Sequence, residues 1–208
     1  MPMAEPLPLY RGDLPAEIAA AYANSTQIAV DTETTGLNMW RDRLCLVQLT
    51  DEHGQLSLVQ ILPGTRPDRL LDLLTDPGKL KIFHFARFDV TRIKQIYGVT
   101  VAPIFCTKIA SKMCRTSTDR HGLKDLVQNI VGVSLDKEKQ TSDWGADTLS
   151  PEQLHYAASD VLYLIAIKET LTEMLKREGR LEMAESCFNF MATLAEFDRL
   201  GWEGIFEH

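Results

Sequence analysis

The sequence has few cysteines, and they are not arranged to build a disulfide framework or a zinc site. No C-x-x-C spacing occurs among the four thiols of the 208-residue chain, which are Cys45, Cys106, Cys114 and Cys187. No apolar run reaches the roughly 18 residues of a membrane-spanning helix. The opening stretch, MPMAEPLPLYRGDLP, lacks the basic and apolar regions of a signal peptide. These absences predict a cytoplasmic protein that has no membrane contact and keeps its thiols reduced.

Several widespread catalytic motifs are also missing. The chain contains no G-x-G-x-x-G or P-loop glycine pattern, no G-x-S-x-G elbow and no H-E-x-x-H pair. What it does have is the composition of an ordinary globular protein, with 45% hydrophobic and 25% charged residues. A chain of this length can bury a full core in one domain, so we expect residues 1–208 to form a single domain.

The charge is unevenly distributed along the chain. The net charge is −7, but residues 79–139 contain 12 Lys and Arg against 5 Asp and Glu. Such a basic segment can bind the phosphates of a polyanion, or it can be an ordinary solvated surface. The candidates for phosphate contacts are Arg87, Lys108, Lys112, Arg115, Lys124, Lys137 and Lys139.

Apolar periodicity and turn residues predict an α/β fold. Strands are expected over residues 27–32, 44–51, 55–62, 80–85 and 101–107. Helices are expected over residues 15–22, 68–74, 88–97, 108–114, 123–131, 151–177 and 181–200. Because three early strands form a meander and later strands alternate with helices, the sheet should be mixed, flanked by helices and followed by long C-terminal helices.

Two acidic residues stand one residue apart at the end of the first predicted core strand. In IAVDTETTGL, Asp31 and Glu33 follow an apolar run. Residues i and i+2 of a strand point to the same face, so both carboxylates should project side by side. Like charges this close repel each other unless a cation lies between them. The pair therefore suggests a divalent metal site.

Three further residues extend this acidic set from two other segments. Asp89 follows a strand and begins a helix, where the helix dipole alone would favour an acid. Tyr156 and Asp160 lie four residues apart on the helix that starts at the capping box of Ser150, and so share a face. Taken singly, Tyr156 could be a core aromatic and Asp160 a solvated edge residue. Four carboxylates from three segments are, however, what two divalent cations about 4 Å apart require for displacement at phosphorus.

At this point the chain resembles the DEDD superfamily of 3′-to-5′ exonucleases, in its tyrosine subtype and specifically ribonuclease D. The supporting stretches are DTETTGL, LCLVQL, HFARFD, GLKDLVQNIVGVSLDKEKQTSDW and LSPEQLHYAASDVLYL, which span roughly residues 27–175. The resemblance implies a ribonuclease H-like fold, two Mg²⁺ or Mn²⁺ ions, and release of nucleoside 5′-monophosphates from the 3′ end of a single-stranded nucleic acid. It differs from full-length ribonuclease D in that we expect no additional C-terminal helical nucleic-acid-binding domains.

The resemblance also implies a role for each matching residue. The metal ligands would be Asp31, which bridges both ions, Glu33 and Asp160 on the nucleophile side, and Asp89 on the other side. Tyr156 would orient the attacking water. Substrate contacts would come from Glu33 and the backbone of Thr34 at the terminal 3′-hydroxyl, from Leu37 against the terminal base, and from His84. The alternatives for the last two are a packed loop leucine and a strand-end histidine.

Two other functions compete with an RNA exonuclease. A DNA-directed exonuclease of the same superfamily would use the same acids, because the 2′-hydroxyl that separates RNA from DNA is recognised by local geometry. A nuclease-like module without catalysis could bind nucleic acid, although the complete set of acids and tyrosine argues against it. We therefore predict a 3′-to-5′ exonuclease that acts on RNA in preference to DNA, with its oligomeric state left open.

Overall fold

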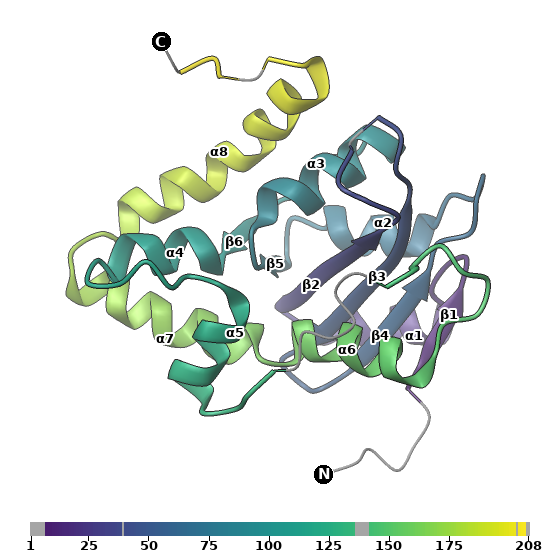
Figure 1. Ribbon diagram of the computed structural model, residues 1–208, viewed down its shortest axis with the longest axis horizontal. Coiled ribbons are helices and arrows are strands. Elements are labelled where there is room, and N and C mark those ends of the chain that lie inside the picture. Colours follow the sequence, from purple (N-terminus) through teal and green to yellow (C-terminus); the bar gives the residue numbers. More distant parts are fainter. Residues whose placement is uncertain (1–6, 39, 136–141, 203, 207–208) are drawn as a thin grey trace.

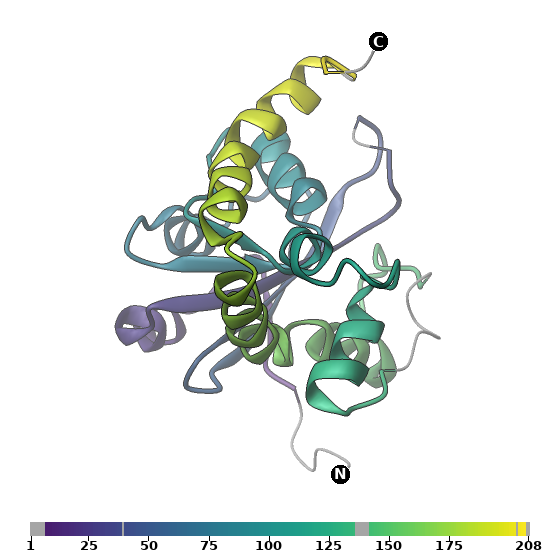
Figure 2. The same cartoon turned by 90° about the vertical axis from the view of Figure 1, so that its left-hand side faces the viewer.

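The computed structural model describes residues 7–38, 40–135, 142–202 and 204–206, and Figures 1 and 2 show helices on both sides of one sheet. The strands are β1 (Leu9–Arg11), β2 (Gln27–Thr34), β3 (Leu44–Asp51), β4 (Leu56–Gln60), β5 (Leu80–Phe83) and β6 (Ile104–Cys106). The helices are α1 (Ala16–Ala21), α2 (Asp68–Thr75), α3 (Ala86–Tyr97), α4 (Thr107–Cys114), α5 (Leu123–Leu126), α6 (Pro151–Leu162), α7 (Leu164–Arg177) and α8 (Leu181–Leu200). A 3₁₀ turn at Tyr22–Asn24 and a π-helical turn at Val127–Val131 complete the elements found in the described residues.

The sheet is mixed, as the sequence predicts. In the described residues its order is β1-β4-β3-β2-β5-β6. The β2, β3 and β4 strands form the antiparallel meander, and β5 and β6 continue the sheet in parallel with β2. The short strand β1, which pairs in parallel with β4, is not foreseen from the sequence. Strand β2 therefore lies inside the sheet, with neighbours on both edges.

The predicted helix over residues 151–177 is wrong in one respect, because the structure divides it at Tyr163 into α6 and α7. The start is as predicted: the Ser150 hydroxyl accepts from the Gln153 amide, and the Gln153 side chain accepts from the Ser150 amide. The break changes which residues face inward. Leu162 is 41% exposed, whereas Leu164 is fully buried. Helix α6 can thus cover β2 to β4 while α7 packs against α4 and β5.

The C-terminal helix α8 packs against α3 and β6, as its broad apolar face indicates. Figure 1 shows its last turns extending away from the sheet. Two bonds from the Arg87 guanidinium to the Asp198 carboxylate, at 2.8 and 2.6 Å, join α3 to this end of α8. Within the described ranges, none of the helices combines the length and apolarity that a bilayer-spanning segment needs. The cytoplasmic location remains a prediction.

Candidate active site

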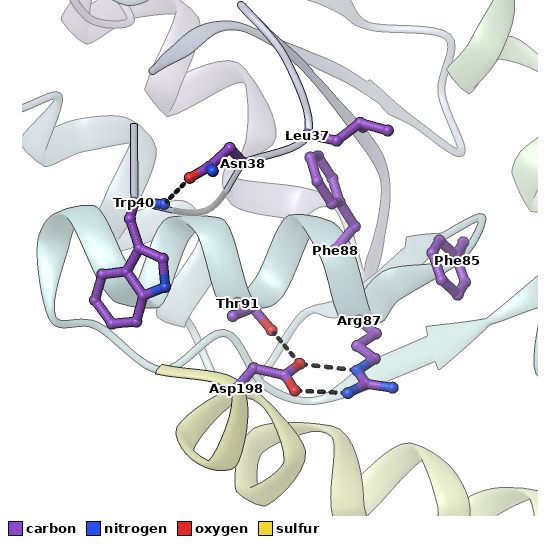
Figure 3. Close-up of a pocket in the computed structure, with 8 residues that line it drawn as sticks. All are labelled: Leu37, Asn38, Trp40, Phe85, Arg87, Phe88, Thr91 and Asp198. Atoms are coloured by element: carbon purple, nitrogen blue, oxygen red, sulfur yellow. Dashed lines mark hydrogen bonds and ion pairs between the residues drawn. The ribbon is translucent and has the colours of Figure 1, made fainter. Parts of the chain in front are cut away.

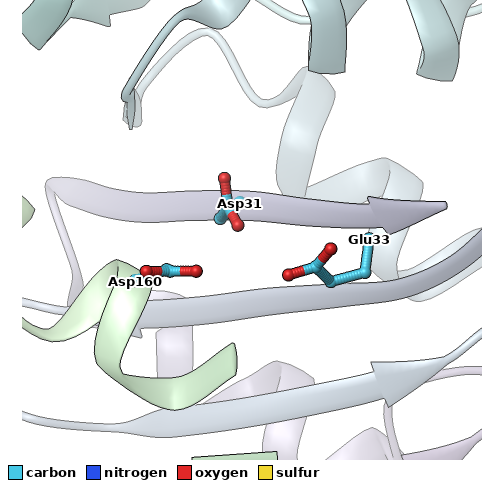
Figure 4. A group of neighbouring side chains, drawn as sticks. All are labelled: Asp31, Glu33 and Asp160. Carbon is cyan, nitrogen blue, oxygen red and sulfur yellow. The ribbon is translucent and has the colours of Figure 1, made fainter. Parts of the chain in front are cut away.

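Three carboxylates meet at the end of β2. Asp31 and Glu33 project from one face of the strand, and Asp160 reaches them from α6 (Figure 4). One oxygen from each of the three residues lies within 4.8 Å of the others. This is the arrangement expected from the two-residue period of a strand and from α6 packing across β2. Hard oxygen ligands of this kind fit Mg²⁺ or Mn²⁺ better than softer metals.

The fourth acid, Asp89, lies beside this cluster on α3. Its side chain is 3% exposed, and its Oδ1 accepts a hydrogen bond from the Thr32 hydroxyl at 2.6 Å. It is outside the group of three whose oxygens lie within 4.8 Å. Its charge still acts on the cluster, because Asp89 is the largest cause after burial of the raised pKa of Asp31. The structure thus brings all four acids near one another but leaves Asp89 outside the group of three.

The electrostatics of the cluster are unfavourable without a cation. Burial, followed by the charges of Asp89, Asp160 and Glu33, raises the pKa of Asp31 well above its ordinary value. Burial, Asp160 and Asp89 raise the pKa of Glu33 to about 9. Burial also raises the pKa of Asp89 and of Asp160 to about 7 each. Side chains that resist ionisation at neutral pH, gathered around one point, are typical of a metal site.

These pKa shifts predict how pH affects the metal-free protein. A carboxyl group in the unfolded chain has a pKa of about 4, so the folded protein binds protons that the unfolded chain has released. Stability is therefore lost as pH rises from about 4 through the folded values of 7 and 9. We expect saturating Mg²⁺ to raise the melting temperature more at pH 8.5 than at pH 5.5, because cations replace protons at the carboxylates.

The measurement is a melting curve with EDTA and with Mg²⁺ at each pH. Taking the difference between the two curves removes the effects of groups that do not bind the metal. An equal Mg²⁺ effect at both pH values would contradict the assignment of these acids as metal ligands.

Tyr156 stands one turn before Asp160 on α6, and the two side chains hydrogen-bond. Burial and the negative charges of Asp160, Glu33 and Asp31 raise the pKa of Tyr156, so its hydroxyl keeps its proton. The Tyr156 ring packs against the buried ring of Trp144, with 6.0 Å between the two ring centroids. The phenol is therefore held as a hydrogen-bond donor at the edge of the acidic cluster, in agreement with the face shared by positions i and i+4.

His84 is held as a neutral hydrogen-bond acceptor. His84 follows β5 and lines the same cavity as Asp31. Its Nδ1 lies 2.9 Å from the Thr107 hydroxyl, which itself donates to the Phe83 carbonyl. Because that hydroxyl has one proton, Nδ1 must be the donor, which leaves Nε2 as an acceptor. Burial and then the charge of Lys108 lower the pKa of His84 to about 4, so it cannot serve as a general acid at neutral pH.

The loop after β2 presents Leu37 to solvent. Leu37 is 81% exposed. Asn38 Oδ1 accepts from the backbone amides of Trp40 and Arg41, and Asp42 accepts from the Asn38 amide. A Cβ at Gly36 would meet the Asp42 carboxylate at 2.3 Å, so the loop needs glycine there. The ladder between β2 and β3 also shifts register between Glu33 and Thr34, a bulge that re-aims the strand end beside the acids.

A cavity of about 350 Å³ opens over the acids. Lys108 and Lys124 of the basic segment line it, together with His84 and Phe85. The other candidate phosphate contacts lie elsewhere or are paired: Lys112 borders a groove between α4 and α8, Arg87 is paired with Asp198, and Arg115 donates to Ser111 and to the Arg120 carbonyl. Lys137 and Lys139 lie outside the described residues. The sequence does not predict that Phe85 lines this cavity, because the position of its ring depends on the left-handed backbone conformation of this residue.

Comparison with known proteins identifies the family. A family model described as 3′-5′ exonuclease matches residues 9–176. The chain belongs to this family. A ribonuclease D of Sphingobium indicum is 39% identical over 166 residues, which are 79% of this chain and 42% of that relative. The match thus spans less than half the length of that ribonuclease D.

Solved structures of Brucella melitensis NrnC extend the match along nearly the whole chain. Brucella melitensis NrnC with bound Mg²⁺ is 45% identical, with a TM-score of 0.88, and the match covers 95% of this chain and 96% of that one. NrnC bound to pGG gives 46% identity and a TM-score of 0.89 over 94% of each chain. The predicted ribonuclease D-like family and ribonuclease H-like fold are therefore confirmed, and the acidic cluster is suited to a divalent metal ion.

Proposed function

We propose that this protein is a two-metal-ion 3′-to-5′ exonuclease that releases nucleoside 5′-monophosphates from single-stranded nucleic acid, with RNA favoured over DNA. The observation that carries the proposal is the meeting of Asp31, Glu33 and Asp160 within 4.8 Å, beside Asp89, at the cavity that Lys108 and Lys124 also line; we call it the acidic cavity. Four acids that repel one another are explained by bound cations. Cations beside a cavity that two lysines also line fit phosphodiester hydrolysis. The mixed sheet and the helices that flank it would together carry this activity as one catalytic domain.

Each side chain has a physical role in this reaction. Bound Mg²⁺ or Mn²⁺ would activate the water and stabilise negative charge on the leaving oxygen. Asp31 would hold both ions, one together with Glu33 and Asp160 and the other together with Asp89. The Tyr156 hydroxyl orients the water. Lys108 and Lys124 attract the phosphates, and the exposed Leu37 packs against the terminal base.

The favoured substrate is the 3′ end of RNA, and very short chains should be accepted. The support for a short substrate is the structure of the related NrnC with pGG. The support for RNA is the similarity to ribonuclease D and the neutral His84, whose Nε2 can accept a hydrogen bond donated by a 2′-hydroxyl. DNA remains the second candidate, because the metal site itself does not distinguish the two sugars.

The proposal is tested with RNA and DNA oligonucleotides of matched sequence that carry a 5′ label. With Mg²⁺ or Mn²⁺ we expect labelled products that shorten one nucleotide at a time, release of 5′-monophosphates, and a faster rate on RNA. Blocking the 3′-hydroxyl with a phosphate should slow the reaction, because Glu33 and Thr34 lose their partner. Products that appear internally, or binding without cleavage, would contradict an exonuclease.

Salt dependence tests whether the basic residues bind phosphates. Neutralising two phosphate contacts on a single strand should reduce the slope of log K against log[salt] by roughly 1.4, about 0.7 for each contact. We expect this for Lys108→Gln combined with Lys124→Gln, since both line the acidic cavity. The matched control is Lys112→Gln with Lys168→Gln, which removes the same charge from residues that line other cavities. If the slope of log K against log[salt] were the same in the two double variants, Lys108 and Lys124 would be ordinary surface residues and not phosphate contacts.

A further inference from the structure

Phe85 has a backbone conformation that bulky residues avoid. Its φ of 69° and ψ of 48° place it in the left-handed region, directly before α3. Among the described residues it is the one non-glycine position with a positive φ. A side chain with a Cβ is sterically strained there, and such strain persists when the surrounding structure imposes it, commonly at functional sites. The fold therefore bears a cost to keep a phenylalanine at this position.

The aromatic ring does not repay this cost by entering the core. It is 48% exposed, although it stands between the buried residues Phe83 and Ala86. The Lys108 ammonium lies 4.3 Å from the ring centroid. A cation over an aromatic ring binds to one face of the ring, so a second partner can stack on the opposite face.

The ring lies where two cavities adjoin. Phe85 lines both the acidic cavity and a second cavity of about 420 Å³. Figure 3 shows Leu37, Phe88 and Phe85 along one side of this second cavity, with Arg87, Thr91 and Asp198 along the other. An exposed aromatic ring beside the proposed metal site, on the apolar side of a cavity whose other side is polar, fits the flat face of a nucleobase.

The place of Phe85 in the sheet indicates which base it would contact. Phe85 follows β5, the neighbour of β2 on the side away from α6, and Asp89 lies one turn further along α3. In the proposed function Glu33 and Asp160 hold the attacking side, and Asp89 holds the side of the leaving oxygen. The nucleotide that carries the leaving 3′-oxygen is the second from the 3′ end, so its base is the one placed near Phe85.

We propose that Phe85 is a substrate-positioning residue on which the second base from the 3′ end stacks, while Leu37 packs against the terminal base. This inference rests on the proposed function. Stacking on one side of the scissile phosphate and packing on the other would fix that phosphate over the acids. The left-handed backbone conformation of residue 85 places the ring at the junction of the two cavities.

The test compares two changes at once, in the enzyme and in the substrate. The variant Phe85→Asn removes the ring, and asparagine tolerates the left-handed conformation. We expect its melting temperature to equal or exceed that of the wild type, while kcat/KM on an RNA trinucleotide falls roughly ten- to a hundredfold, as loss of one base stack implies. On a trinucleotide whose second nucleotide is abasic, wild type and Phe85→Asn should be equal.

Controls separate stacking from a general disturbance. Phe85→Tyr keeps a ring and should restore the rate on the intact trinucleotide. Trp202→Asn removes an aromatic side chain that is 54% exposed and lines neither cavity. The value of kcat/KM on each of the two trinucleotides should therefore be unchanged in this variant. Phe85→Gly provides a second variant suited to positive φ. If neither the asparagine nor the glycine variant folded, the strain on which the inference is built would be refuted.

The remaining outcomes are also decisive. Equal losses on the intact and abasic trinucleotides would show that Phe85 acts through the fold and not through the base, and an unchanged rate on both would remove it from substrate binding. If wild-type protein with Mg²⁺ degraded neither substrate, the proposed exonuclease function itself would fail, which is a result distinct from cleavage without dependence on Phe85.

Discussion

Replacing Asp31 with asparagine is expected to lower the exonuclease rate by about a thousandfold or more, and at the same time to raise the melting temperature of the metal-free protein. The rate falls because, in the proposed function, Asp31 would be the ligand shared by both cations, with Glu33 and Asp160 on one side and Asp89 on the other. Melting temperature rises because burial and the three neighbouring acids raise the pKa of Asp31, so the wild type must bind a proton on folding at neutral pH, whereas the neutral amide needs none. Activity and stability should thus change in opposite directions.

The matched control for this prediction is Asp72→Asn, which removes one exposed carboxylate from α2. It should change neither the rate nor the effect of Mg²⁺ on the melting temperature. The measurements are single-turnover rates with saturating Mg²⁺ and melting curves in EDTA. Near-normal activity of Asp31→Asn would show that the acidic cluster is not the catalytic centre.

Tyr156→Phe is expected to lower kcat by roughly ten- to a thousandfold without loss of stability, because one hydrogen bond that positions the water disappears. The phenylalanine keeps the ring contact with Trp144, so α6 should remain in place. Metal affinity should also be maintained, since the four acids are unchanged. Rate and melting temperature are measured on the same preparation.

Tyr22→Phe provides the opposite control. The Tyr22 hydroxyl is fully buried and bonds the Ser57 hydroxyl at 2.9 Å and the Gln55 carbonyl at 3.1 Å, away from the acids. Its loss should lower the melting temperature and leave kcat unchanged. If Tyr156→Phe behaved in the same way as Tyr22→Phe, Tyr156 would be a structural tyrosine and would have no part in the reaction.

The sequence predicts those parts of the site that depend on short-range periodicity. Asp31 and Glu33 share a face because strands repeat every two residues, and Tyr156 and Asp160 share one because helices repeat every 3.6. The capping box at Ser150 also lies within three residues. In each case the residues that decide the geometry are close together in the chain, so their spacing carries the information.

Features that depend on distant partners or on backbone dihedrals are not visible in the same way. Strand β1 is three residues long and exists through its pairing with β4, almost 50 residues later. The break at Tyr163 occurs without a proline or glycine, and the ion pair of Arg87 with Asp198 joins residues 111 positions apart. The left-handed backbone of Phe85 is likewise unmarked, because phenylalanine is not a residue that favours it.

The most direct test of the central claim, that cations held by Asp31, Glu33, Asp89 and Asp160 contact the scissile phosphate, is a metal-rescue measurement on a phosphorothioate substrate. Sulfur replaces one non-bridging oxygen of the last phosphodiester in an RNA oligonucleotide. Because Mn²⁺ accepts sulfur more readily than Mg²⁺ does, we predict slow cleavage of one phosphorothioate isomer with Mg²⁺ and a rate restored toward that of the unmodified RNA with Mn²⁺. Equal slowing with both metals, for both isomers, would contradict direct contact between the metal site and the phosphate that is cleaved.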